Sequence, residues 1–215
     1  MVQRSLDRTD ALYGKSAGSI KTVPHCPVAI TRLIHQCDKP MKQSITNESG
    51  ERDGRRDFDF LIGTWKIQHR RLKQRLKGCT EWEEFEGTSE VRSILGGLGN
   101  MDELTMDGAS DHVQAVTVRL YNPATCEWSI YWTASSHPGR MDVPMVGKFD
   151  GPRGEFYSQE VFEGRHIFNR FIWNVDSSDS CRWEQAFSAD AGKIWETNWT
   201  MKFTRTDHGP LTVEC

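Results

Sequence analysis

The chain lacks three features that would assign its class at once: a long apolar run, an excess of charge of one sign, and cysteines spaced for a metal. No apolar segment approaches the roughly 18 residues that span a bilayer, and the first residues have no apolar secretion signal. Lysine and arginine number 27 against 30 aspartates and glutamates, a formal net charge of −3. We therefore expect a soluble, cytoplasmic protein that binds neither a membrane nor nucleic acid.

Signatures of catalysis by a nucleophile or a metal are also absent from the sequence. The six cysteines form no CxxC pair and have no metal-ligand spacing with histidine, and there is no GxSxG or HExxH motif. In a reducing compartment, free thiols are favoured over three disulfides. The sequence therefore predicts no metal and no cofactor, and it identifies no catalytic residue.

Aromatic residues are almost missing from the first quarter of the chain. Of the 22 aromatic residues, 21 follow Asp57, including all eight tryptophans. A segment without bulky apolar groups cannot offset the entropy that it loses on folding. We therefore expect residues 1–57 to be a largely disordered extension, residues 58–206 to form one domain, and residues 207–215 to be a C-terminal tail.

Beyond Asp57 the chain reads as a series of β-strands. Segments rich in aromatic and β-branched residues recur between turn signals, and none has a sustained helical period. About ten strands joined by short connections predict an all-β fold, a closed antiparallel up-and-down barrel, with a two-sheet sandwich as the alternative. The expected strands are Leu61–Lys73, Thr80–Ser93, Met101–Met106, Val113–Tyr121, Glu127–Ala134, Val143–Phe149, Gly154–Phe162, Arg165–Val175, Arg182–Ser188 and Ile194–Thr206.

Two short motifs are interpreted as turns. Ser188–Trp195 resembles the Asp-box, in which short polar side chains hydrogen-bond the turn of a hairpin and a tryptophan packs against it, with Ile194 in place of the usual threonine. The glycines of residues 96–99 match no phosphate-binding loop and have no strand–helix context. We therefore expect a flexible loop there.

The first and last expected strands carry a family resemblance. Gly63-x-Trp65 at the start of the first strand and Arg205 at the end of the last resemble the lipocalin (calycin) signature, and residues 57–205 resemble a group of uncharacterised bacterial lipocalin-like proteins. The resemblance implies a barrel with a central cavity and no agreed activity. It also implies that Arg205 packs across Trp65 and closes one end, a contact that gains cation–π energy.

The signature tryptophan gives the register of the candidate site. If Trp65 faces the interior, alternation places His69 and Arg71 inside as well, unless a bulge shifts them to the rim. By the same rule Trp132 and Trp199 belong to an apolar lining. Two further candidates are less defined: in Arg165–Val175 either Asn169 or Arg170 faces inward, and Glu184 forms an ion pair, for example with Arg119 or Arg170, or acts as a base.

These residues predict a ligand-binding site: His69, Arg71, Trp132, Arg170, Glu184 and Trp199. An aromatic lining with two polar groups suits a small, largely hydrophobic molecule that carries a polar or anionic group. One alternative is a cofactor-free isomerase or cyclase that uses His69 or Glu184 as acid and base. Another is a haem-binding barrel with His69 or His166 on the iron. The sequence leaves open whether the protein forms a homodimer.

Overall fold

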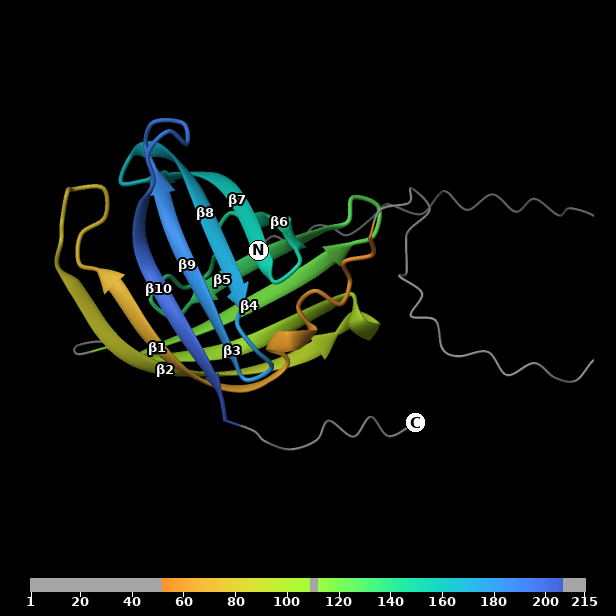
Figure 1. The fold of residues 1–215 in the computed structure, drawn as a ribbon. Coiled ribbons are helices and arrows are strands. Elements are labelled where there is room, and N and C mark those ends of the chain that lie inside the picture. Colours follow the sequence, from red (N-terminus) through yellow and green to blue (C-terminus); the bar gives the residue numbers. More distant parts are fainter. Residues whose placement is uncertain (1–51, 109–111, 207–215) are drawn as a thin grey trace, which may run out of the picture. The chain divides into compact units, whose positions relative to one another are not determined.

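The computed structural model describes residues 52–108 and 112–206. Within them it contains ten strands and two short 3-10 turns, η1 (Asp59–Leu61) and η2 (Leu95–Gly97) (Figure 1). None of the helices in this part of the chain is long and apolar enough to cross a membrane. The strands are β1 Gly63–Leu72, β2 Trp82–Ile94, β3 Gly99–Asp107, β4 His112–Asn122, β5 Glu127–Ala134, β6 Met145–Asp150, β7 Arg153–Phe162, β8 Arg165–Val175, β9 Ser180–Ser188 and β10 Glu196–Arg205.

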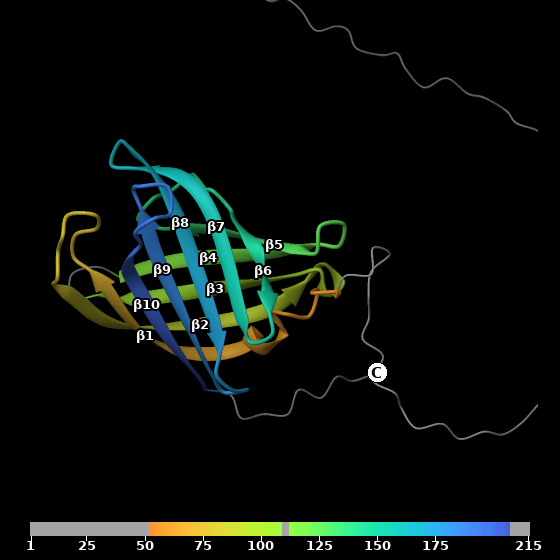
Figure 2. The same cartoon turned by 45° about the horizontal axis from the view of Figure 1, so that its top comes forward.

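The ten strands form the predicted closed antiparallel barrel. Each strand pairs with the next along the chain, and β1 pairs with β10 to close the ring (Figure 2). In that closing pair Trp65 lies opposite Arg205 and Arg71 lies opposite Trp199. A ring of this kind leaves no unpaired edge, which the sandwich alternative would have exposed. The expected all-β meander is therefore confirmed.

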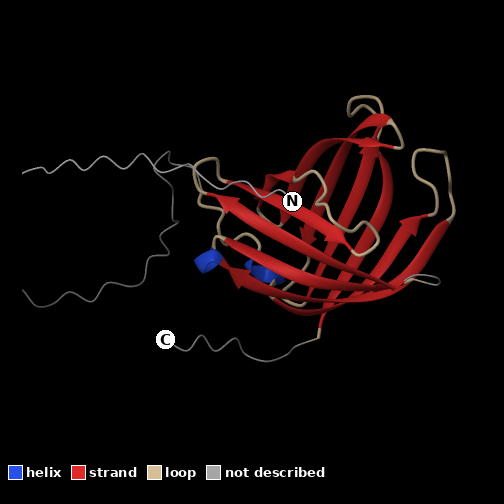
Figure 3. Cartoon of the chain, turned by 180° about the vertical axis from the view of Figure 1, so that it is seen from behind, coloured by secondary structure: helices blue, strands red, loops and turns tan. Residues whose placement is uncertain are grey.

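The two ends of the barrel differ in how they are covered. Strand β1 begins at the end that carries η1 and η2, which we call the closed end, and both 3-10 turns lie there (Figure 3). Strand β1 finishes at the opposite end, which we call the open end. The β1–β2, β5–β6 and β7–β8 loops lie at this open end because the strands alternate in direction.

The closed end is filled by an aromatic cluster around Phe58, the residue before η1. The Phe58 ring is fully buried and lies 5.1 Å from the ring of Trp128 and 4.9 Å from that of Phe149, centroid to centroid. Arg205 lies across Trp65, with its guanidinium carbon 4.2 Å from the ring. Edge-to-face rings and a guanidinium over an indole both add to the energy of burial. The closure that the resemblance implies is therefore present.

Strict alternation in β1 places its odd-numbered residues inside the barrel. The pleat sends successive side chains to opposite faces, so burial has a period of two. Trp65, Ile67 and His69 are buried, whereas Lys66, Gln68 and Arg70 are exposed.

The expected extension and tail lie mostly outside the described residues, which begin at 52 and end at 206. Residues 52–57 are described, and they contact the barrel. The Gly54 amide donates a hydrogen bond to the Tyr121 hydroxyl at 2.9 Å, and the Trp128 indole N–H donates to the Gly54 carbonyl at 3.0 Å. The domain boundary at residue 57 stays a prediction.

Both turn motifs adopt defined conformations. The Ser188 hydroxyl oxygen accepts the Gly192 N–H, and Asp190 Oδ1 accepts the N–H groups of Lys193 and Ile194, as an Asp-box requires. The glycine segment contains the 3-10 turn η2, where Gly96 and Gly97 adopt φ of 62° and 90°. Glycine takes that left-handed conformation without a steric penalty.

Candidate functional site

The barrel encloses a cavity of about 360 Å³ that reaches from the closed-end cluster to the open end. Eight of its lining residues are tryptophans or phenylalanines, and they come from β5 and from the neighbouring strands β7 to β10. They are Trp132, Phe162, Phe171, Trp173, Trp183, Phe187, Trp199 and Phe203. An interior of this kind desolvates an apolar molecule and stacks on flat groups.

Arg71 lies where the cavity meets the open end. Its Nε donates a hydrogen bond to Glu83 Oε1 at 2.7 Å, and both side chains are partly exposed. Its guanidinium carbon lies 5.1 Å from the ring of Phe85 and 5.3 Å from that of Trp199. Arg71 therefore combines a partly exposed ion pair with two cation–π contacts. It lines the cavity, as its position on the inward face of β1 predicts.

A second arginine, Arg75, enters the same space from the β1–β2 loop. Its guanidinium carbon lies 5.6 Å from the ring of Phe187 and 5.7 Å from that of Trp199. Among the described residues it has no ion pair and no hydrogen-bond partner. Burial, followed by the repulsion of Arg71, lowers the pKa of the Arg75 guanidinium to about 10. The carboxylates of Glu160, Glu83 and Glu196 act in the opposite direction, but none of them lies within ion-pair distance of Arg75. Arg75 is therefore still a cation at neutral pH.

One carboxyl group, Glu160 of β7, lines the cavity near this cation. Its Oε1 accepts a hydrogen bond from Asn169 Nδ2 at 2.9 Å. Burial is the main cause that raises the pKa of Glu160, and the neighbouring Asp142 adds to it, whereas Asn169 and Arg75 act in the opposite direction. Removal from water therefore favours the neutral acid more than in an exposed glutamate.

Deeper in the cavity, the charges neutralise one another. Arg119 Nη1 forms an ion pair with Asp102 Oδ1 at 2.5 Å, and both residues are buried. Asp102 Oδ2 also accepts hydrogen bonds from the hydroxyls of Ser89 and Thr117 at 3.2 and 3.3 Å. The Asp102 carboxylate therefore has a full set of donors, which a buried charge requires.

His69 faces the interior but does not line the cavity. Its ring stacks on Phe85 with centroids 4.6 Å apart, and its Nδ1 accepts a hydrogen bond from the Trp199 indole N–H at 3.3 Å. Burial and the charge of Arg71 lower the pKa of His69 to about 4. The imidazole is therefore neutral at pH 7 and supports the Trp199 ring from behind.

Arg170 and Glu184 lie on the outer face of the barrel, apart from the other predicted site residues. Arg170 Nη2 is 3.8 Å from a Glu184 oxygen, and its guanidinium carbon lies 4.5 Å from the Trp195 ring. Of the two residues that β8 left open, Asn169 is the one that lines the cavity. The expected pairing of Glu184 with an arginine is present, but it is a contact on the outside.

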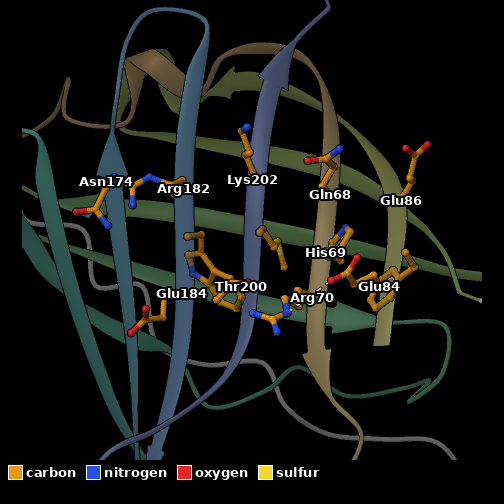
Figure 4. Close-up of a pocket in the computed structure, with 13 residues that line it drawn as sticks. Gln68, His69, Arg70, Glu84, Glu86, Asn174, Arg182, Glu184, Thr200 and Lys202 are labelled. Carbon is orange, nitrogen blue, oxygen red and sulfur yellow. Dashed lines mark ion pairs between the residues drawn. The ribbon is translucent and has the colours of Figure 1, made fainter. Parts of the chain in front are cut away.

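Glu184 also borders a shallow outer hollow of about 510 Å³ over β2, β1, β10, β9 and β8 (Figure 4). Charges of both signs cross it, including the Arg70–Glu84 ion pair at 3.6 Å. Its lining includes His69, Phe85 and Trp183, fewer aromatic side chains than line the inner cavity. We therefore take the inner cavity as the candidate site.

In the described part of the chain, no group of three histidine, cysteine, aspartate or glutamate side chains is arranged to hold a metal ion. His166 is exposed on β8, so it does not face the cavity. The groups near the open end that could hold a polar part of a ligand include Arg71, Arg75, Arg140, Glu160 and Asn169.

Comparisons with known proteins add little to this picture. No protein-family profile matches the chain, and no curated protein sequence matches it. Among solved structures it is similar to the S-type phycobiliprotein lyase CPES from Guillardia theta, with a TM-score of 0.46 and 10% identity, over 71% of this chain and 92% of that chain. The function is therefore argued from the residues of this chain.

Proposed function

We propose that the barrel binds a small, largely hydrophobic molecule with a polar or anionic group inside its cavity. The observation that carries the proposal is the enclosed, aromatic-lined space with two arginines at its open end. At about 360 Å³ it falls within the roughly 300–1,000 Å³ that small-molecule sites occupy. Apolar walls around a few charged groups are typical of such sites.

A cofactor-free isomerase or cyclase is supported less well. His69 and Glu184, the acid–base groups that this alternative would use, do not line the cavity. Haem ligation by His69 would need the ring to leave its stack on Phe85 and its hydrogen bond to Trp199. We therefore favour binding without a chemical step.

The test fills the cavity with a bulky side chain. The same substitution on the opposite face of the same strand is the control. Val113 and Val116 both belong to β4, but only Val113 lines the cavity. We expect Val113→Trp to weaken binding of 1-anilinonaphthalene-8-sulfonate at least tenfold, measured by the fluorescence of the dye, and Val116→Trp to leave it within twofold. Thermal melts followed by circular dichroism establish that both variants are folded.

Equal dye affinity in both folded variants would place the binding site outside the cavity and contradict the proposal. Native mass spectrometry of protein purified from its own source gives a second measurement. A retained small molecule lost from Val113→Trp and kept by Val116→Trp would identify the natural ligand by its mass.

A further inference from the structure

We propose that the ligand is a hydrophobic monocarboxylic acid, bound with its carboxylate between Arg75 and Arg71 at the open end and its apolar body directed into the barrel. This inference rests on the proposed function, because it requires the cavity to be the binding site. It adds the chemical class of the ligand, its orientation and the residue that recognises its charge.

Arg75 carries a positive charge with no carboxylate partner at ion-pair distance among the described residues. Most arginines in the described part of the chain have such a partner, as Arg71 has Glu83 and Arg119 has Asp102. The carboxylates of Glu160, Glu83 and Glu196 act on Arg75 only from farther away. Its side chain is partly exposed, and its guanidinium lies against the rings of Phe187 and Trp199. A cation that is partly removed from water is costly unless it is paired. A ligand carboxylate would supply the missing partner, and a guanidinium binds a carboxylate with two parallel hydrogen bonds.

The two arginines lie close to each other at the open end. Both guanidinium groups lie over the same indole, that of Trp199, at 5.3 and 5.7 Å from its centroid. Like charges held this close repel, and the pKa of Arg75 is lowered partly by Arg71. Arg71 uses its Nε for Glu83, which leaves its terminal N–H groups for a further acceptor. An anion bound by both would relieve the repulsion.

The charges deeper in the cavity determine the orientation of the ligand. The deep cation, Arg119, is already neutralised by Asp102, which in turn accepts hydrogen bonds from Ser89 and Thr117. A ligand carboxylate at that depth would meet the Asp102 charge. The wall beyond it is apolar and includes Leu61 and Phe203. The charged end of the ligand therefore belongs at the open end, and the apolar end belongs inside.

The acidic groups of the cavity limit the ligand to one carboxylate. A second carboxylate farther along the molecule would approach Asp102, which lines the deeper part of the cavity. The affinity for a diacid should therefore be lower than that for a monocarboxylic acid of the same length.

The experiment uses three probes of one chain length, dodecanoate, methyl dodecanoate and dodecanedioate, together with the neutral dye N-phenyl-1-naphthylamine. Displacement of the bound dye at pH 7.5 reports the affinity of each unlabelled probe. In the unmodified protein we expect dodecanoate to bind at least tenfold more tightly than its methyl ester or dodecanedioate. The dye, which has no charge, reports whether the cavity itself binds hydrophobic molecules.

The decisive variant is Arg75→Gln, with Lys77→Gln as the matched control. Lys77 is in the same loop, is exposed and pairs with Glu163 at 2.9 Å. We expect Arg75→Gln to weaken dodecanoate at least tenfold and to leave methyl dodecanoate and the dye within twofold. Lys77→Gln should change none of them.

The outcomes separate the two proposals. If neither the dye nor any dodecyl probe binds, the proposed function itself fails. If the dye binds but dodecanoate and its ester bind equally, or if Arg75→Gln weakens both alike, the cavity is a hydrophobic site and the assignment of a carboxylic acid is overturned.

Discussion

The arginines at the two ends of the barrel differ in their hydrogen-bond partners. At the closed end, Arg205 lies over Trp65 and donates hydrogen bonds to the carbonyls of Phe60, Ile62 and Ser178. At the open end, Arg75 lies over Trp199 with no hydrogen bond or ion pair among the described residues. Both arginines contact an indole ring, but in the described part of the chain only the guanidinium of Arg205 also donates hydrogen bonds to the protein. The closed end is thus built for stability, and the open end keeps unused binding capacity.

The largest expected effect breaks the closed end. Trp65→Ala should lower the free energy of unfolding by about 3–5 kcal/mol, because it removes a fully buried indole. Arg205→Ala should cost less, about 1–2 kcal/mol, since its side chain is partly solvated. Urea unfolding of both variants and of the double variant gives the coupling energy, which should exceed about 0.5 kcal/mol. Additive effects would mean that the Trp65–Arg205 contact contributes nothing.

The next effect concerns the wall between the two ends, where His69 is buried as a neutral ring. Its pKa falls from 6.5 to about 4 on folding, so the unfolded chain binds the proton more readily. This stability is present above pH 6.5 and is lost as the pH falls towards 4, by roughly 3 kcal/mol. His69→Gln should remove that part of the pH dependence in urea unfolding at pH 7 and pH 4. His166→Gln, an exposed control on β8, should keep it.

A smaller effect separates binding from stability at the open end. Arg71→Ala should weaken 1-anilinonaphthalene-8-sulfonate by about 1.5–3 kcal/mol, the scale of a charge-assisted hydrogen bond. Stability should change by less than about 1 kcal/mol, because the ion pair with Glu83 is partly exposed. Arg70→Ala is the matched control, since Arg70 points outward and pairs with Glu84. Equal loss of dye affinity in both variants would contradict the role of Arg71.

His69→Gln should also leave ligand affinity within about tenfold, or ~1.4 kcal/mol, because His69 does not line the cavity. Fluorescence titration at pH 7.5 measures this. A turnover assay, once a ligand is known, adds the sharper comparison. An acid–base role for His69 would cost on the order of 10²–10⁴ in rate with binding preserved, and that result would revive the isomerase alternative.

The smallest expected effect is that of removing the first 50 residues. A chain that begins at Glu51 should melt cooperatively within about 3 °C of the full chain, because the removed segment contains no tryptophan or phenylalanine to bury. A chain that begins at Phe58 should melt lower, since it loses the hydrogen bonds of Gly54 to Tyr121 and Trp128. Loss of folded protein in the first case would show that the segment belongs to the domain.

The sequence predicted the barrel from its series of short strands, and it predicted the inward face of β1 from the position of Trp65 in the lipocalin-like signature. It did not resolve β8, where both faces carry apolar residues. The physical reason is that the Asp-box hairpin covers part of the outer face, so Trp195 shelters Arg170 from solvent there. When a residue points outward but is covered by a neighbouring hairpin, the alternation of polar and apolar residues no longer shows which face of the strand is outside.

Two residues of the candidate site were missed for different reasons. Arg75 comes from a loop, where no periodicity relates one side chain to the next. Glu160 shares the even-numbered face of β7 with Phe156, so alternation from that phenylalanine could have placed it inside. His69 packs behind the Trp199 ring and therefore does not line the cavity. The spacing of residues in the sequence does not predict such side-chain packing.

The entry and exit of the described chain have a practical consequence. Gly54 is held by Tyr121 and Trp128, and the Thr206 amide donates to the Thr64 carbonyl, so both ends of the domain leave from the side opposite the cavity mouth. The described chain therefore enters and leaves the barrel at its closed end. A biosensor that immobilises it through either terminus would present the mouth to the analyte, and a fluorescent reporter on the β1–β2 loop would sit at the rim.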